Sequence, residues 1–154
     1  MTKIYAAYGS NLNHEQMARR CPKAKFIGIG VLKNYRMIFC RVADIEYAHD
    51  ECVQIGLWRV TDDCIKALDS YEGYPNLYGK GNCSVYLGKG KSTKAFIYFM
   101  NYGEYEPPSD GYYGSIAQGY LDCGINLRSL ENANRLSEDL WFEKVYGKEL
   151  DLQS

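Results

Sequence analysis

The sequence predicts an α+β fold in which strands outnumber helices. Apolar residues alternate with polar ones at a period of two over several segments, and helical spacing is found in only a few others. Short polar turns separate many of the strand-like segments, which is typical of hairpins. The pattern predicts about six or seven strands and four helices. Because the strands outnumber the helices and are mostly joined by hairpins, a strictly alternating doubly wound sheet is excluded. At 154 residues we expect one domain over residues 1–154, with enough core to fold without disulfides or metal.

The first predicted elements are a strand over residues 4–8 and a short helix that ends near Arg20. The segment Gly9-Ser10-Asn11-Leu12 interrupts the strand. Asn13, with Gln16 three residues later, forms a capping pattern that indicates where the helix begins.

A hairpin is predicted next, because apolar residues alternate over residues 25–41 around a break near Lys33-Asn34. The polar stretch Asp44–Glu51 is predicted to be a loop. Val53, Ile55, Leu57 and Val60 then mark another strand.

The second half of the chain begins with a helix whose predicted N-cap is Thr61 and which ends near Gly73, and acidic residues fill its first turn. Two strands are predicted around 84–87 and 94–100.

The last two predicted elements are helices. Pro107-Pro108-Ser109-Asp110 opens one that stops at Gly124. The other spans about residues 127–146, with four residues predicted to face inward: Leu130, Ala133, Leu140 and Trp141.

The charge balance narrows the classes of partner. Eighteen Lys and Arg oppose 19 Asp and Glu, for a net charge of −1, so we expect no broad nucleic-acid or anionic-membrane binding. The N-terminus has one Lys before a short apolar stretch, which fits neither a signal peptide nor a transmembrane helix and predicts a cytoplasmic protein. Six cysteines without a C-x-x-C spacing are then expected to be free thiols.

Three other patterns in the sequence are incomplete forms of phosphate, dinucleotide and metal-binding motifs. Gly90-Lys91-Ser92-Thr93 resembles the end of a P-loop but lacks its first glycine, so a hairpin turn is favoured. Gly28 and Gly30 lack the third glycine of a dinucleotide fingerprint. His14 and His49 are isolated, so no metal site is predicted and no cofactor is expected.

The loop Tyr8-Gly9-Ser10-Asn11-Leu12 is the first candidate binding segment. Gly9 permits a positive φ, and Ser10 and Asn11 favour turns, so successive backbone N–H groups can converge near a helix N-terminus. Such a nest binds carboxylates, phosphates or developing oxyanions. An ordinary strand-to-helix turn is an equally good interpretation of the same residues.

The second candidate is Glu72, which is expected at a helix C-terminus among Tyr71, Tyr74 and Tyr78. Burial and the helix dipole both disfavour an anion there, and a raised pKa suits proton transfer near neutral pH. The alternative is an exposed Glu before a glycine cap.

Together the two segments resemble the γ-glutamylcyclotransferase family. The resemblance rests on Tyr8-Gly9-Ser10-Asn11-Leu12, then Leu68-Asp69 with Glu72-Gly73, and on Tyr78 six residues after the Glu. Further matches extend it over about residues 4–124: Gly56–Val60, Ala95–Tyr98, and Pro108-Ser109 with Tyr113, Ile116 and Gly119.

This resemblance implies a small β-barrel of about six strands, parallel and antiparallel, with flanking helices. Family members release 5-oxoproline and a free amine from small γ-glutamyl compounds, without a cofactor. By the family pattern Glu72 is the catalytic acid and base, and the N–H groups of Gly9, Ser10, Asn11 and Leu12 hold the substrate. Tyr8, Tyr78 and Tyr113 are expected in the substrate pocket.

Some features depart from the pattern. The loop reads Y-G-S-N-L where the glutathione-specific branch has Y-G-S-L, so glutathione is not the preferred substrate. Abundant tyrosine after Glu72 suits an aromatic leaving group. Two other hypotheses remain open at this point: a non-catalytic protein that binds a small, nucleotide-like metabolite in the same pocket, and a structural or interaction domain.

Overall fold

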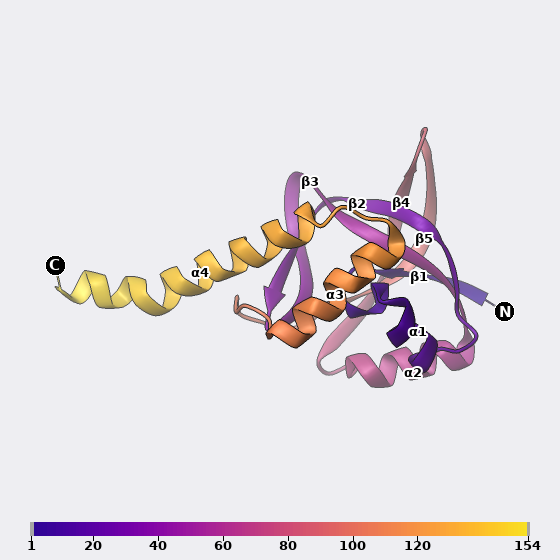
Figure 1. The fold of residues 1–154 in the computed structure, drawn as a ribbon, viewed down its shortest axis with the longest axis horizontal. Coiled ribbons are helices and arrows are strands. Elements are labelled where there is room, and N and C mark those ends of the chain that lie inside the picture. The colour runs from indigo at the N-terminus through magenta and orange to yellow at the C-terminus, as the bar shows by residue number, and fades with distance from the viewer. Residues whose placement is uncertain (1, 154) are drawn as a thin grey trace.

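The computed structural model describes residues 2–153, and side chains for residues 2–147. The chain forms an α+β fold in which a five-stranded sheet closes into a ring with four α-helices around it (Figure 1). The strands are β1 (Thr2–Ala7), β2 (Lys25–Cys40), β3 (Val42–Thr61), β4 (Tyr78–Gly88) and β5 (Lys91–Met100). The helices are the 3-10 helix η1 (Ser10–Leu12), α1 (His14–Arg20), α2 (Asp62–Glu72), α3 (Asp110–Cys123) and α4 (Arg128–Gln153).

The strand order around the ring is β1-β3-β2-β4-β5. Antiparallel pairing joins β1 to β3, β3 to β2, and β4 to β5 over many residues. The other two contacts are narrow: β2 meets β4 at Val31 and Tyr86, and β1 meets β5 in parallel at Tyr5 and Phe96. The expected mixture of parallel and antiparallel pairing is therefore present, but the strand count of six or seven is wrong.

The excess in the predicted count arises in β2 and β3, which form one long hairpin. The break predicted at Lys33-Asn34 is a register shift within β2, and the hairpin turns instead at Arg41. The stretch Asp44–Glu51 belongs to β3 and is not a separate loop: residues 44–47 pair with β2, and residues 48–51 lie at the register shift. Arg36 lies opposite Glu46, and their side chains form an ion pair at 3.1 Å. Charged cross-strand pairs stabilise a solvated strand that composition alone marks as a loop.

The caps of α2 and α3 confirm the helix boundaries. The Thr61 side chain accepts a hydrogen bond from the Cys64 N–H at 3.2 Å, and Ser109 accepts one from the Tyr112 N–H at 3.2 Å. Both helices end at a left-handed glycine, Gly73 with φ 67° and Gly124 with φ 71°.

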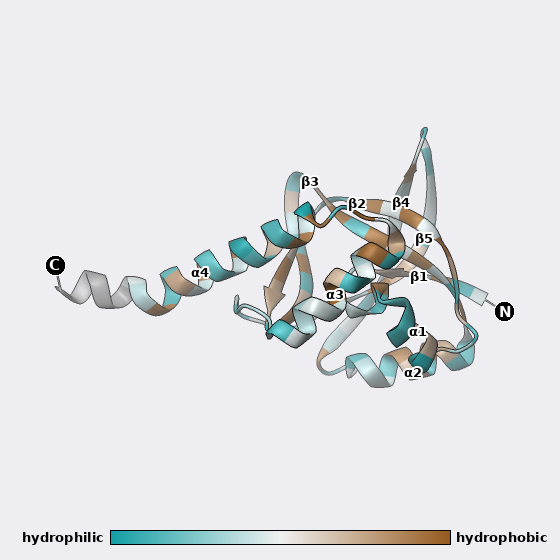
Figure 2. Cartoon of the chain, in the orientation of Figure 1, coloured by the Kyte–Doolittle hydropathy of each residue, from teal (hydrophilic) through white to brown (hydrophobic). Residues whose placement is uncertain are grey.

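The first half of α4 packs on β2, and the rest of the helix extends beyond the ring (Figure 1). Buried Ser137 accepts a hydrogen bond from the Phe39 N–H and donates one to the Ala133 carbonyl, both at 2.8 Å. Leu130 and Ala133 are buried as predicted, whereas Leu140 and Trp141 are only half-buried because the helix has left the core. Figure 2 shows hydrophobic residues along the ring strands and a largely hydrophilic start to α4.

All six cysteines are free thiols, in agreement with the sequence prediction. In the part of the chain that the structure describes, no helix has the length and apolar character needed to span a membrane.

Candidate active site

A cavity of about 190 Å³ lies where β1 and α2 end. Its walls contain six tyrosines, Tyr5, Tyr8, Tyr71, Tyr78, Tyr98 and Tyr112. Gly9, Ser10, Asn11 and Glu72 complete its polar lining, so both segments singled out in the sequence meet here.

The loop after β1 forms one turn of 3-10 helix along this cavity. The Leu12 N–H donates to the Gly9 carbonyl at 3.0 Å, and the Asn13 N–H donates to the Ser10 carbonyl at 3.1 Å. Within the described residues no hydrogen bond occupies the N–H groups of Gly9, Ser10 or Asn11. These three residues line the cavity, and successive N–H groups without a protein partner are suited to bind an anion or a developing oxyanion.

Gly9 is needed for close approach and not for a positive φ. Its φ is −117°, in contrast to the conformation that the sequence suggests. A Cβ at this position would lie 3.0 Å from the Ala43 Cβ and 3.6 Å from the Tyr112 hydroxyl. The lack of a side chain therefore lets the loop pack directly against β3 and α3.

Gly119 supports the same loop from behind. A Cβ on this α3 residue would lie 2.6 Å from the Asn13 backbone nitrogen and 2.7 Å from the Leu12 carbonyl carbon. Figure 1 shows α3 beside the segment that follows β1. The backbones of α3 and the loop are thus in direct contact.

Glu72 is the last residue of α2 and is half-buried at the cavity wall. Burial raises the pKa of its carboxyl from 4.5 to about 7, although the positive charge of Arg20 acts in the opposite direction. The Asn11 amide nitrogen lies 3.5 Å from Glu72 Oε1. A carboxyl group with this pKa exchanges protons readily near neutral pH.

Arg20 fixes the orientation of the Asn11 amide. Arg20 Nη1 donates to Asn11 Oδ1 at 2.5 Å, and a guanidinium has no acceptor, so this contact identifies the amide oxygen. The Asn11 nitrogen therefore faces the Tyr5 hydroxyl, at 3.0 Å, and Glu72. Arg20 also stacks 3.5 Å above the centre of the Tyr71 ring, and the Tyr71 hydroxyl lies 3.1 Å from Ser10 Oγ.

Three wall tyrosines bond to the backbone. The Tyr8 hydroxyl donates to the Tyr98 carbonyl at 2.8 Å, and the Tyr78 hydroxyl donates to the Ala43 carbonyl at 2.7 Å. The Tyr112 hydroxyl accepts from the Ala43 N–H at 3.0 Å. Burial raises the pKa of Tyr112 to about 12 and raises those of Tyr8 and Tyr78 too, so all three hydroxyls stay neutral.

Most of the site residues expected from the sequence meet at this cavity: Tyr8, Gly9, Ser10, Asn11, Glu72 and Tyr78. Leu12 is buried beneath the loop, and its N–H is used by Gly9. Tyr113 does not line the cavity, because it faces Phe39 at 6.3 Å between ring centres, and its neighbour Tyr112 lines the cavity instead.

Sequence reasoning missed other parts of the site. Tyr5 lies two residues before the end of β1 in a run of buried apolar residues, which gives no functional signal. Arg20 adjoins exposed Arg19, and nothing in the local pattern separates the two. Val42, Ala43 and Leu77 are cavity residues whose types carry no chemical signal.

The comparisons with known proteins agree with one another. A family model described as gamma-glutamyl cyclotransferase, AIG2-like, matches residues 5–119. The γ-glutamylcyclotransferase of Homo sapiens is 26% identical over 155 residues, which cover 92% of this chain and 82% of that protein. The Mus musculus protein is 28% identical over 164 residues, covering 98% and 87%. A solved structure titled gamma-glutamyl cyclotransferase superposes with a TM-score of 0.79 at 25% identity, covering 86% of each chain.

Proposed function

Since the chain belongs to the gamma-glutamyl cyclotransferase, AIG2-like family, we propose that it converts a γ-glutamyl compound into 5-oxoproline and a free amine or amino acid. The observation that carries this proposal is the half-buried Glu72, with a pKa of about 7, in the wall of a cavity that Gly9, Ser10 and Asn11 also line. The N–H groups of these three residues have no hydrogen-bond partner in the part of the chain that the structure describes. A proton carrier and an oxyanion site are the two groups that an intramolecular aminolysis needs.

In the proposed reaction the substrate supplies its own nucleophile. The α-amine attacks the γ-carbonyl carbon, a five-membered lactam forms, and the bond from that carbon to the leaving nitrogen breaks. The enzyme has to hold the chain folded, since a positioned intramolecular attack avoids most of the entropic cost of bringing reactants together. No Ser or Cys nucleophile is required.

Glu72 carries the proton in this scheme. As a carboxylate it takes a proton from the α-ammonium group, and as a carboxylic acid it passes that proton to the leaving nitrogen. A second proton, lost from the attacking nitrogen, is exchanged with water, so that the products are the lactam and an ammonium ion. The N–H groups of Gly9, Ser10 and Asn11 hold the carbonyl oxygen or the substrate carboxylate.

The function is tested by incubating the protein with a panel of γ-glutamyl amino acids, γ-glutamyl amines and glutathione and measuring 5-oxoproline by mass spectrometry. We expect release from at least one member of the first two classes. Bulky aromatic amines belong in the panel, because the Tyr71 and Leu77 side chains are partly exposed beside the cavity. An absence of 5-oxoproline across the panel, together with tight retention of a metabolite, would favour the binding-protein hypothesis.

The dependence of kcat/KM on pH is expected to follow the ionisation of Glu72. Because the carboxyl must be ionised to accept a proton, we expect kcat/KM to rise with pH up to about 7, the pKa of Glu72. It then falls where the substrate α-ammonium titrates, at about 8 or above. An acidic limb near pH 4.5 would contradict a buried base. The measurement is kcat/KM against pH with a substrate found in the panel.

Arg20 is expected to set the pH at which kcat/KM rises, as a positioning residue that acts through Asn11 and Glu72. In Arg20→Met the Asn11 amide is released and the charge that lowers the pKa of Glu72 is lost, so the acidic limb moves above pH 7. The matched control is Arg19→Met on the same helix, where Arg19 forms an ion pair with Glu15 at the exposed surface. An equal response of the two variants would rule out a role for Arg20 in the site.

A further inference from the structure

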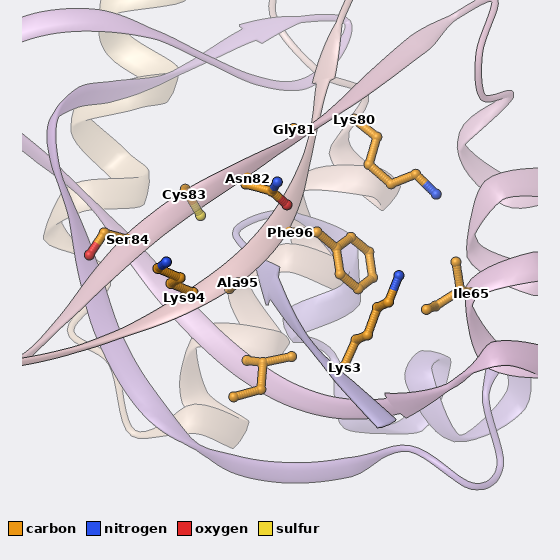
Figure 3. A pocket seen from close by; sticks show the side chains of 11 residues that line it. Lys3, Ile65, Lys80, Gly81, Asn82, Cys83, Ser84, Lys94, Ala95 and Phe96 are labelled. Carbon is orange, nitrogen blue, oxygen red and sulfur yellow. The ribbon is translucent and has the colours of Figure 1, made fainter. Parts of the chain in front are cut away.

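A second and larger hollow lies on another side of the ring, with a volume of about 810 Å³ (Figure 3). It is present because β1 meets β5 only at Tyr5 and Phe96, so the start of β1 diverges from β5. Lys3 and Ile4 of β1 form one side, and residues 80–84 of β4 form another. This basic groove is open to solvent and contains none of the residues assigned above to the proposed reaction.

The basic groove is lined by Lys3, Lys80 and Lys94, and none of its described lining residues is acidic. Lys80 pairs with Asp69 at 2.8 Å, which uses one of the three donors of its ammonium group. For the described residues, no carboxylate lies within ion-pair distance of Lys3 or Lys94. Because Asp69 balances the charge of Lys80, the local excess of positive charge comes from Lys3 and Lys94, in a protein whose net charge is −1.

The lysines surround an apolar floor. Figure 3 shows Lys3 and Lys80 extending toward the region of the Phe96 ring, with Ile65 beside them and Lys94 next to Ser84 at the other end. The Lys80 Nζ lies 5.7 Å from the centre of the Phe96 ring. An aromatic and aliphatic floor with cationic sides matches an organic molecule that carries an anionic group.

The basic groove is separated from the Glu72 cavity by a wall of three rings. Tyr5 stacks on Phe96 with 5.3 Å between ring centres, and Tyr98 meets both rings edge-on. Tyr5 and Tyr98 line the Glu72 cavity, while Phe96 lines the groove. A molecule in the groove would therefore lie behind the proposed active site, not inside it.

We propose that the basic groove is a second ligand site, which binds a small organic phosphate with its phosphate between Lys3 and Lys80 and its apolar body over Phe96 and Ile65. Ammonium groups bind phosphate oxygens through charge-assisted hydrogen bonds, and the Asn82 side-chain amide also lines the groove. The size of the groove is within the range of small-molecule sites. The proposal does not depend on cyclotransferase activity.

The test uses adenosine 5′-monophosphate as the probe, in isothermal titration at low ionic strength. We expect saturable binding to one site, and adenosine without its phosphate to bind about tenfold or more weakly. Lys3→Met is expected to lower the affinity for the nucleotide by about tenfold or more, because one charge-assisted hydrogen bond is lost. Glu72→Gln is expected to bind it as the unmodified protein does, which separates this site from the Glu72 cavity.

The matched control is Lys91→Met, which removes the same charge from β5, a strand that also lines the groove, at a position outside it. We expect its affinity for the nucleotide to be unchanged. The proposal is overturned if adenosine 5′-monophosphate does not saturate, if Lys91→Met weakens binding as much as Lys3→Met does, or if inorganic phosphate binds as tightly as the nucleotide.

Discussion

Replacing Glu72 by Gln is expected to lower kcat for 5-oxoproline release by about a thousandfold, within the range that a positioned acid and base contributes. The amide keeps the size of the side chain and its contact with Asn11, but it cannot carry a proton at neutral pH. The measurement is release of 5-oxoproline under saturating substrate. Glu15→Gln, at an exposed ion pair on α1, is the matched control and is expected to retain full activity.

Glu72→Gln is also expected to be more stable to unfolding than the unmodified protein above pH 7. The pKa of Glu72 is about 7 in the folded chain against 4.5 for an ordinary Glu, so the folded state binds more protons between these pH values. Stability therefore falls as pH rises through this window, and the cost is complete above it. Glutamine has no such cost, which corresponds to a gain of up to about 3 kcal/mol in the free energy of unfolding.

Loss of activity with a gain of stability separates a catalytic role for Glu72 from a structural one. Chemical denaturation of both proteins at pH 5 and pH 8 measures the difference. If Glu72→Gln is inactive and also less stable at pH 8, then the carboxylate holds the fold together and the proposed mechanism is wrong.

Gly119→Ala is expected to have the second large effect. Its new Cβ would lie 2.6 Å from the Asn13 nitrogen and 2.7 Å from the Leu12 carbonyl carbon, and backbone atoms cannot turn aside as a flexible side chain can. Either α3 or the loop has to shift, which costs about 1–3 kcal/mol of folding free energy. Because this loop carries the N–H groups of the proposed oxyanion site, kcat should fall as well.

Gly114→Ala is the matched control for this substitution. Gly114 lies in the same helix, and a Cβ there meets no atom within 4 Å. We expect this variant to keep its activity and to gain about 0.5–1 kcal/mol, since alanine loses less backbone entropy in a helix than glycine does. Equal stability of the two variants, measured by thermal or urea unfolding, would show that the loop and α3 separate easily.

The features that the sequence predicted well are local ones. Thr61 and Gly73 bound α2 through contacts within a few residues, and these place Glu72 at the last helical position. A turn after β1 was likewise predicted from Gly9, Ser10 and Asn11, although Gly9 is needed there for its close approach to Ala43 and not for its φ. Motif order along the chain then sufficed to associate the two segments.

The features that were missed depend on long-range contacts. The polar residues 44–51 form strand because β2 lies alongside them, and no local pattern reports that partner. The choice between Tyr112 and Tyr113 is set by the rotation of α3 against the Ala43 backbone. Arg20 joins the site through its contacts with Asn11 and with the Tyr71 ring. In each case the role of the residue is set by a contact with a segment distant in sequence, which the local sequence does not reveal.

The ring has a mechanical consequence that follows from its two narrow contacts. Strands β1, β3 and β2 form one broad block, and the β4–β5 hairpin pairs with it in the sheet at Tyr5 with Phe96 and at Val31 with Tyr86. Side-chain hydrogen bonds from Tyr8 to the Tyr98 carbonyl and from Tyr78 to the Ala43 carbonyl also join the two parts. Joints with few interstrand hydrogen bonds open at a lower free energy than the ladders on either side. The hairpin carries Tyr78 and Tyr98 of one cavity and Lys80 and Lys94 of the other. Any displacement of the hairpin relative to the block would therefore change the width of both cavities together.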